Sequence, residues 1–143
     1  MDIATLQLQQ HLKQYHASLT GARKTVFHAL LDREAMSMNE LVELTAGQLD
    51  RATVYRTVEL FVEIGIIQRL PIGWKYKIEL TDTFNHHHHH LTCGRCGTVI
   101  PLAEDETLES RLSELAQLYQ FKADSHQIEI RGLCLTCQKA TRD

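Results

Sequence analysis

Apolar residues in the first half of the chain recur every three or four positions, the spacing of helices that bury one face. The pattern predicts four helices: one ending near residue 15, one over 21–32, a short third after Ser37, and one over 51–64. Their shared core is expected to contain Leu6, Leu8, Leu12, Tyr15, Ala22, Val26, Ala29, Leu30, Leu41, Val42, Leu44, Val54, Val58, Phe61 and Val62.

Capping residues mark the ends of the third and fourth helices. Ser37 and Glu40 have the spacing of a capping box that opens the third helix, and Gly47 is expected to end it. Asp50 is the expected N-cap of the fourth helix, which should stop at Gly65. These two helices therefore have sequence signals that are independent of their apolar stripes.

Two segments after the fourth helix predict a β-hairpin. Residues 66–70 and 74–80 are the expected strands, joined by a turn at residues 71–73. Helices followed by a basic-tipped hairpin make a winged helix, in which the N-terminal residues of the recognition helix reach bases and phosphates of DNA. The expected contacts are Arg51, Thr53, Tyr55 and Arg56, although such residues also occur on ordinary solvated faces.

The second half of the chain predicts a smaller unit of strands and one helix. Strands are expected at 98–102 and 127–131, with a helix from about residue 104 to 119 between them. A run of five histidines, residues 86–90, precedes these elements. In an extended run side chains alternate, so His87 and His89 would face one way and His86, His88 and His90 the other. One short strand could therefore supply two imidazole sites, unless the run is a purification tag or a disordered metal-scavenging tract.

Four cysteines form two Cys-x-x-Cys pairs, Cys93 with Cys96 and Cys134 with Cys137. This ligand set is typical of a closed tetrahedral structural zinc site, because a two-residue spacer lets both sulfurs of a pair face one ion. The alternatives are a redox pair or a disulfide. The chain shows no signal peptide, and in a cytoplasmic protein disulfides rarely persist, which favours zinc.

Length and charge set bounds on the partners. The 143 residues contain no apolar run long enough to span a membrane, so a cytoplasmic protein without a membrane partner is expected. A unit of about 60–80 residues is marginally stable alone and gains from a metal ion or a partner subunit. The net charge of −3 gives no global basic field, so any DNA surface must be a local patch.

Taken together, these motifs resemble the ferric uptake regulator (Fur) superfamily of bacterial metal-dependent repressors over nearly the whole chain. The resemblance implies an α+β fold: an N-terminal winged-helix DNA-binding domain over residues 1–82 and a small C-terminal α/β dimerisation domain over residues 83–143. The residues that carry it are Thr20 and Arg23, residues 52–56, the histidine run with Cys93, Cys96 and Gly97, and Glu129, Ile130, Gly132, Cys134 and Cys137.

The resemblance also implies three metal sites. The four cysteines match the family's structural zinc site. A second site in the dimerisation domain matches completely, at His87, His89, Glu109 and His126.

The family's hinge-side sensor site matches only in part. Glu79, His88 and His90 lie on its positions, whereas Ala35 and Pro101 stand where relatives carry further ligands. Ser18 likewise stands where relatives commonly place a basic residue for the minor groove.

The function implied is a homodimeric repressor of metal-uptake genes that binds a palindromic, AT-rich operator of double-stranded DNA and is not an enzyme. Iron(II) is the expected effector, because Glu79 offers an oxygen ligand at the sensor site. Structural Zn²⁺ is expected in addition, at the four cysteines. A zinc-sensing regulator is the alternative, followed by a peroxide or Mn²⁺ sensor. Three alternatives come from other classes of protein: a zinc hydrolase with Glu106 or Glu109 as its general base, a thiol oxidoreductase, and a metal-storage protein.

Overall fold

The computed structural model describes residues 1–140, which form two compact units. The first unit is Met1–His86, and the second begins at His87. The expected division at residue 82 lies four residues before this point, in a segment between the last strand of the first unit and the first strand of the second.

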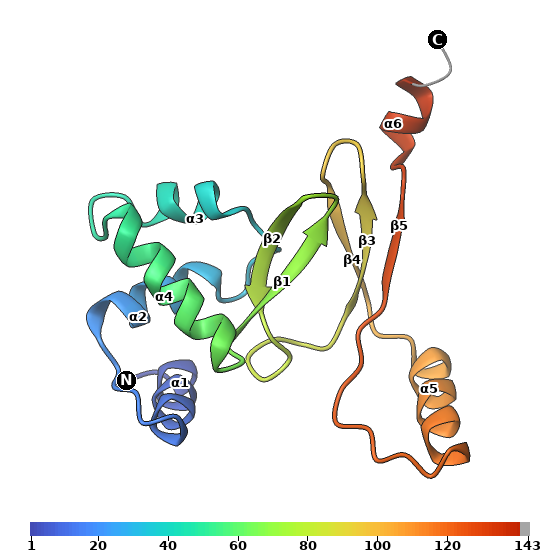
Figure 1. The fold of residues 1–143 in the computed structure, drawn as a ribbon, viewed down its shortest axis with the longest axis horizontal. Coiled ribbons are helices and arrows are strands. Elements are labelled where there is room, and N and C mark those ends of the chain that lie inside the picture. The colour runs from blue at the N-terminus through green and yellow to red at the C-terminus, as the bar shows by residue number, and fades with distance from the viewer. Residues whose placement is uncertain (141–143) are drawn as a thin grey trace. The chain divides into compact units, whose positions relative to one another are not determined.

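Four helices and a two-stranded hairpin make up the first unit (Figure 1). Each helix begins at a polar N-cap whose side chain accepts a backbone N–H of the first turn, and Ser37 and Glu40 complete both bonds of the predicted capping box. The third helix ends at Leu44 with Thr45 as its C-cap, so Gly47 lies in the following turn and does not terminate the helix. The helices are α1 (Ile3–Gln14), α2 (Gly21–Leu30), α3 (Met38–Leu44) and α4 (Arg51–Glu63).

The core of the first unit is formed by the apolar faces of these helices and of the hairpin. Phe27 and Phe61 are the largest fully buried side chains, and Phe27 was not among the predicted core positions. Three predicted positions were wrong, because Leu6, Tyr15 and Leu44 lie on the solvent side of their helices and are 43%, 51% and 45% exposed. Helical spacing identifies the apolar stripe of a helix, but the neighbouring elements decide how much of that stripe is buried.

The hairpin consists of β1 (Ile67–Ile72) and β2 (Lys75–Leu80), paired antiparallel. The predicted turn was displaced: Pro71 belongs to β1 and faces Tyr76, and the two-residue turn is Gly73-Trp74. Proline is compatible with this strand because the sheet has only two full strands and an edge position needs no donated bond. Met36 adds an isolated bridge to Ile78, so helices and hairpin together form the predicted winged helix.

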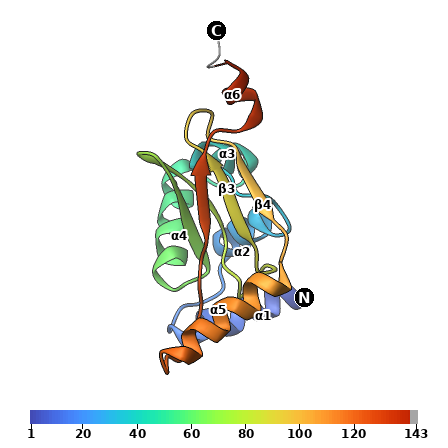
Figure 2. The ribbon, with the colours of Figure 1, turned by 90° about the vertical axis from the view of Figure 1, so that its right-hand side faces the viewer.

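The second unit contains a three-stranded sheet with β3 in the middle (Figure 2). Strand β3 pairs antiparallel with β4 and parallel with β5, and the connection from β4 to β5 carries α5. A short helix follows β5, where the sequence had suggested only an extended tail. The elements are β3 (His89–Cys93), β4 (Val99–Leu102), α5 (Glu106–Leu118), β5 (Glu129–Gly132) and α6 (Leu135–Ala140).

Apolar side chains in the second unit are mostly exposed, in contrast to the first. Within residues 87–140 the buried side chains are His89, His90, Thr92, Cys93 and Cys137, and helix α5 has no buried residue. The leucines of α5 therefore do not form a core stripe in the single chain. This unit does not rely on a hydrophobic core of its own, which leaves its stability to other contacts.

None of the helices in residues 1–140 is long and apolar enough to cross a membrane.

Candidate metal centres and nucleic-acid interface

The four cysteines come together in the second unit from two places in the chain. Cys93 ends β3, the turn after it carries Cys96, and Cys134 and Cys137 lie at the start of α6. Their sulfur atoms lie within 4.8 Å of one another, and those of Cys96 and Cys134 are 3.7 Å apart. Four sulfurs around a tetrahedral zinc ion at ~2.3 Å would be separated by about 3.8 Å. The cluster therefore fits zinc, and no disulfide joins its members.

Backbone amides stabilise one thiolate of this cluster, whereas the other thiols oppose further ionisation. N–H groups of Cys134 and Cys96 hold the pKa of Cys93 down to about 6. The hydroxyl and backbone of Thr98 also lower the pKa of Cys96. In contrast, the hydrogen bond with Cys134, burial and the neighbouring thiols raise the pKa of Cys137 to about 12. A dication at the centre would relieve this repulsion, since zinc binds thiolates.

The second cysteine pair corrects one argument from the sequence. The sequence pattern predicts both pairs at strand ends, whereas a reactive thiol pair typically lies near a helix N-terminus. Cys134 instead precedes the first residue of α6, and Cys137 lies within that helix. All four sulfurs nevertheless converge at one point, which fits a metal site better than a separate redox pair.

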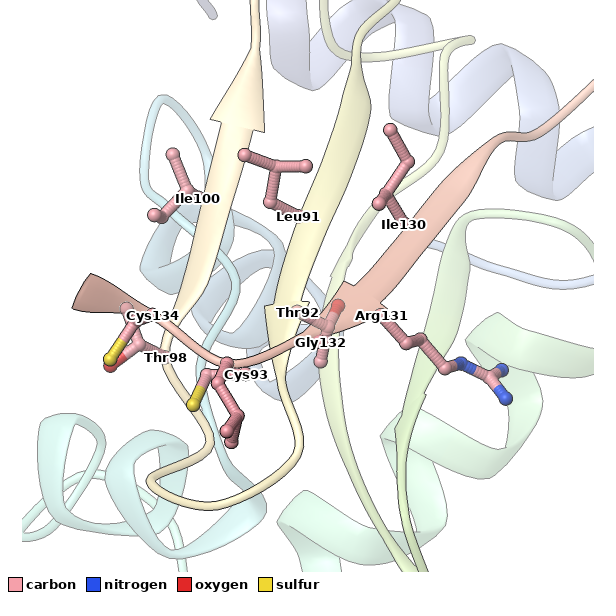
Figure 3. A pocket seen from close by; sticks show the side chains of 10 residues that line it. Leu91, Thr92, Cys93, Thr98, Ile100, Ile130, Arg131, Gly132 and Cys134 are labelled. Atoms are coloured by element: carbon pink, nitrogen blue, oxygen red, sulfur yellow. The ribbon is translucent and has the colours of Figure 1, made fainter. Parts of the chain in front are cut away.

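An apolar hollow of about 150 Å³ lies beside the cysteines on one face of the sheet (Figure 3). Leu91 on the central strand pairs with Ile100 on β4 and Ile130 on β5, so one apolar side chain from each strand forms a row across the sheet. Ile100 and Ile130 are 43% and 54% exposed. Arg131 also lines the hollow, but its side chain points away from the apolar row in Figure 3, so the row is better suited to an apolar partner surface than to a polar ligand.

Three histidines and one glutamate form a second cluster in the same unit. His87 precedes β3, His89 is its first residue, Glu109 lies in the first turn of α5, and His126 lies between α5 and β5. Glu109 is the hub: its Oε1 is 2.7 Å from His89 Nε2 and 3.1 Å from His87 Nε2, and its Oε2 is 2.6 Å from His126 Nε2. His87 Nε2 and His126 Nε2 are 3.0 Å apart.

Convergence of these donor atoms fits a tetrahedral ion after a small expansion. Nitrogen and oxygen ligands at ~2.0–2.1 Å from zinc would be about 3.4 Å apart, so the contacting atoms, now 2.6–3.1 Å apart, would separate by about 0.3–0.8 Å. Burial opposes ionisation of Glu109, but the hydrogen bond from His89 and the charges of the nearby imidazoles keep its pKa below the usual value. The one carboxylate is therefore ready to ligate at neutral pH.

His89 is held by a bond that metal binding would have to change. Its Nδ1 accepts the backbone N–H of Ile128 at 3.3 Å, so the proton of a neutral ring lies on Nε2 and points to Glu109. An ion bound at Nε2 displaces this proton to Nδ1, where it would face the Ile128 amide. Loading of this site therefore requires a local shift at the start of β5 or of the ring.

Alternation along the histidine run separates two pairs of rings, as the sequence predicted. The His87 and His89 ring centroids are 4.7 Å apart, and those of His88 and His90 are 4.6 Å apart. The residues proposed for the sensor site are divided between the units. Glu79 lies in the first unit, where it is buried on β2 and accepts a 2.7 Å hydrogen bond from the Gln68 amide, and His88 and His90 lie in the second.

The N-terminal turns of α4 carry an ordered cluster of basic and polar side chains. Arg51 and Arg56 are exposed, and Arg56 donates a 3.4 Å hydrogen bond to the hydroxyl of Thr53. Arg51 donates to the Tyr55 hydroxyl at 3.2 Å and lies over its ring at 5.6 Å. All four predicted DNA-contacting residues thus lie on one part of the helix.

A further residue of this cluster was not found from the sequence. Asn39, on α3, accepts a 3.0 Å hydrogen bond from Arg51 through its side-chain oxygen. The two residues are twelve positions apart, and no local spacing rule connects them. Arg23 also has a structural role, since its guanidinium donates to the backbone carbonyl of Ser18 at 2.5 Å and orders the segment before α2.

Comparisons with known proteins agree with this arrangement of winged helix and metal-ligand clusters. The ferric uptake regulation protein of Bacillus subtilis is 32% identical over 136 residues, which cover 87% of this chain and 90% of that protein. The crystal structure of the Vibrio cholerae ferric uptake regulator has a TM-score of 0.69 and 30% identity, covering 88% of this chain and 98% of that one. The Helicobacter pylori Fur structure, described as having three functional metal-binding sites, has a TM-score of 0.74 and 24% identity, with 94% and 91% covered.

A model of the ferric uptake regulator family matches residues 14–131, most of the chain. Members of this family are non-enzymatic, dimeric, DNA-binding proteins, and the solved relatives bind zinc, iron or manganese. The chain therefore belongs to the ferric uptake regulator family of metal-dependent transcriptional repressors, and it combines a winged-helix unit with a C-terminal dimerisation domain.

Proposed function

We propose that this protein is an iron(II)-responsive repressor of metal-uptake genes that works in the cytoplasm as a homodimer. The observation that carries the proposal is the second unit's double cluster of donor atoms. Four sulfurs and a His₃Glu set lie at opposite ends of the same short strand, β3. A unit with so few buried apolar side chains is expected to depend on bound ions for its shape.

The cysteine cluster is proposed as the structural zinc site. Its ligands are Cys93, Cys96, Cys134 and Cys137, and the sulfur spacing supports this assignment. Zinc there would fix α6 and the end of β5 against the end of β3. His87, His89, Glu109 and His126 are proposed as the dimerisation-domain site, which Zn²⁺ or Fe²⁺ could occupy with these nitrogen and oxygen donors.

The regulatory ion is proposed to bind Glu79, His88 and His90. This site rests on the family resemblance and on the division of the three residues between the two units. An ion that needs ligands from both units would favour one relative pose of them, with a coupling of typically ~1–3 kcal/mol. The carboxylate of Glu79 makes this site better suited to iron(II) or Mn²⁺ than a site built from thiolates would be.

The proposed DNA surface is the start of α4, with Arg51, Thr53, Tyr55 and Arg56. Its support is the exposure of both guanidinium groups and their ordering by neighbouring side chains. Dimerisation is supported by the apolar residues that the single chain leaves exposed on and after α5, among them Leu115, Leu118 and Phe121. A two-fold dimer requires two half-sites, hence the proposed palindromic operator. Its AT-rich composition is proposed from the family resemblance.

A direct test begins with metal analysis of protein purified without added metal, where one tightly held zinc per chain is expected. An operator is then selected from random duplexes, and binding is followed by fluorescence anisotropy under anaerobic conditions with Fe²⁺, Zn²⁺, Mn²⁺ or chelator. We expect iron(II) to tighten binding by about 5- to 150-fold. An Arg51→Ala, Arg56→Ala double variant should lose binding, whereas the surface control Arg111→Ala should not. Equal affinity with and without chelator would refute the switch.

Zinc sensing is the second candidate, favoured by the His₃Glu cluster, whose four donors suit tetrahedral zinc. The two functions differ in the same titration. A zinc sensor would reach full operator binding at free Zn²⁺ far below the Fe²⁺ needed, and Glu79→Cys would improve its zinc response. An iron sensor would lose its response to Fe²⁺ in that variant.

A further inference from the structure

The tip of the β1–β2 hairpin carries an aromatic side chain that the core does not use. Trp74 is 89% exposed, the highest value among the large apolar side chains of residues 1–140. It is also the single tryptophan of the chain. Solvating so large a ring is unfavourable, so its position on a protruding turn calls for a partner.

Turn chemistry does not explain the tryptophan. The hairpin closes through the two residues after Ile72, and Gly73 has φ +60°, which suits the first central position of a type II′ turn. The left-handed conformation there requires glycine, whereas the second position accepts many residues. Removing the indole would therefore leave the turn intact.

The charges around the ring indicate what kind of surface it meets. Lys75 Nζ lies 4.8 Å from the centre of the Trp74 ring, and Lys77 follows two residues later. The other basic residue of the hairpin, Arg69, is ion-paired with Glu59. Glu79 is buried at the far end of β2, so no acidic side chain on the hairpin offsets the two lysines near the tip.

We propose that the hairpin tip is a second DNA contact, in which Lys75 pairs with a phosphate and the Trp74 ring packs on the adjoining deoxyribose of the strand beside the half-site. The partner is duplex DNA because an aromatic plane with one lysine stacked on it fits alternating sugar faces and phosphates. Hairpin and α4 also share one core, since Ile67, Ile78 and Phe61 belong to the same buried cluster, so both contacts are held by one packed unit. This inference rests on the proposed DNA-binding function.

The single tryptophan lets the test read this residue directly. Metal-loaded full-length protein is titrated with its selected operator while Trp74 emission, its quenching by acrylamide, and the anisotropy of labelled DNA are measured. We expect saturation of the two signals at the same DNA concentration and at least a twofold fall in the quenching constant. Trp74→Ala should weaken binding about fivefold or more, and Trp74→Phe should restore most of it.

Charge-matched variants separate the lysine from general electrostatics. Lys75→Gln should lower the slope of log K against log salt by about 0.9 per protomer, whereas the second-unit control Lys122→Gln should leave it unchanged.

The outcomes distinguish failure of this inference from failure of the function. DNA that binds fully while Trp74 stays open to acrylamide would overturn the hairpin contact and leave the repressor intact. A Trp74 signal that responds to anionic lipid vesicles but not to operator would overturn it in favour of a membrane surface. Absence of DNA binding under every metal loading would overturn both proposals.

Discussion

Asn39→Ala tests whether the recognition arginine is held in place before DNA arrives. The Asn39 side-chain oxygen accepts a hydrogen bond from Arg51 Nη2 at 3.0 Å, and the Tyr55 hydroxyl accepts one from Arg51 Nη1 at 3.2 Å. Ordering one long side chain on binding costs ~0.5–1.5 kcal/mol, or ~1–3 kcal/mol for two protomers. Because Tyr55 still restrains Arg51 in the variant, we expect the lower part of this range, roughly a 5- to 30-fold rise in Kd.

The assay is operator anisotropy across a salt series, with thermal unfolding as a control. No charge is lost in Asn39→Ala, so its salt slope should equal that of wild type, whereas Arg51→Ala should lower the slope by about 0.9 per protomer. Alanine is a good helix former at this exposed position, so stability should not fall. The exposed amide variant Gln10→Ala is the matched control. Wild-type affinity in Asn39→Ala, or full additivity with Arg51→Ala, would show that Asn39 does not position the arginine.

Four further predictions concern the metal centres and the core. Cys93→Ser should remove the tightly held zinc, seen by metal analysis, and abolish slow amide exchange in the second unit; retained zinc would contradict the four-sulfur site. The pKa of Glu109 is lowered in the folded protein, so its ionised carboxylate stabilises the metal-free fold fully above pH 4.5, the ordinary pKa of glutamate. This stabilisation is lost as the pH falls through the lowered pKa, and Glu109→Gln should therefore make the free energy of unfolding depend less on pH in this acidic range. Metal bound at His89 Nε2 should accelerate exchange of the Ile128 amide, and unchanged exchange would place the ion elsewhere. Phe61→Ala should lower the free energy of unfolding by about 3–5 kcal/mol in urea titrations, and a loss below 1 kcal/mol would show a loosely packed core.

Local patterns predicted the first unit well because its determinants are local. The capping box at Ser37 and the N-cap at Asp50 are bonds between residues three apart, and both are present. The predicted turn begins too early because proline is common in turns, but an edge strand also tolerates it, and Pro71 lies within β1. The exposure of Leu44 depends on which neighbour reaches it, and the sequence of its own helix does not contain that information.

The candidate sites divide in the same way. Alternation in the histidine run follows from strand geometry and needed no knowledge of the rest of the fold. Glu109 and His126 reach His87 from segments 22 and 39 residues away, and only the family resemblance pointed to them. Neither the local pattern nor the family resemblance predicted Asn39, because its contact with Arg51 is made between two helices. The leucines of α5 recur at helical spacing and are exposed in the single chain, and spacing alone does not distinguish a chain's own interior from a surface for another subunit.

The length of the histidine run has a consequence for how this chain tolerates change. Counting back from Cys93, both proposed ligand pairs use the last four histidines, and His86 is in neither. Deleting any one of the five therefore keeps imidazole at every ligand position and shortens only the non-strand segment before β3. A second deletion would bring Asn85 to the place of His87. The run thus has one histidine more than the proposed sites need, so the loss of a single codon would leave each face of the strand with its pair of imidazoles.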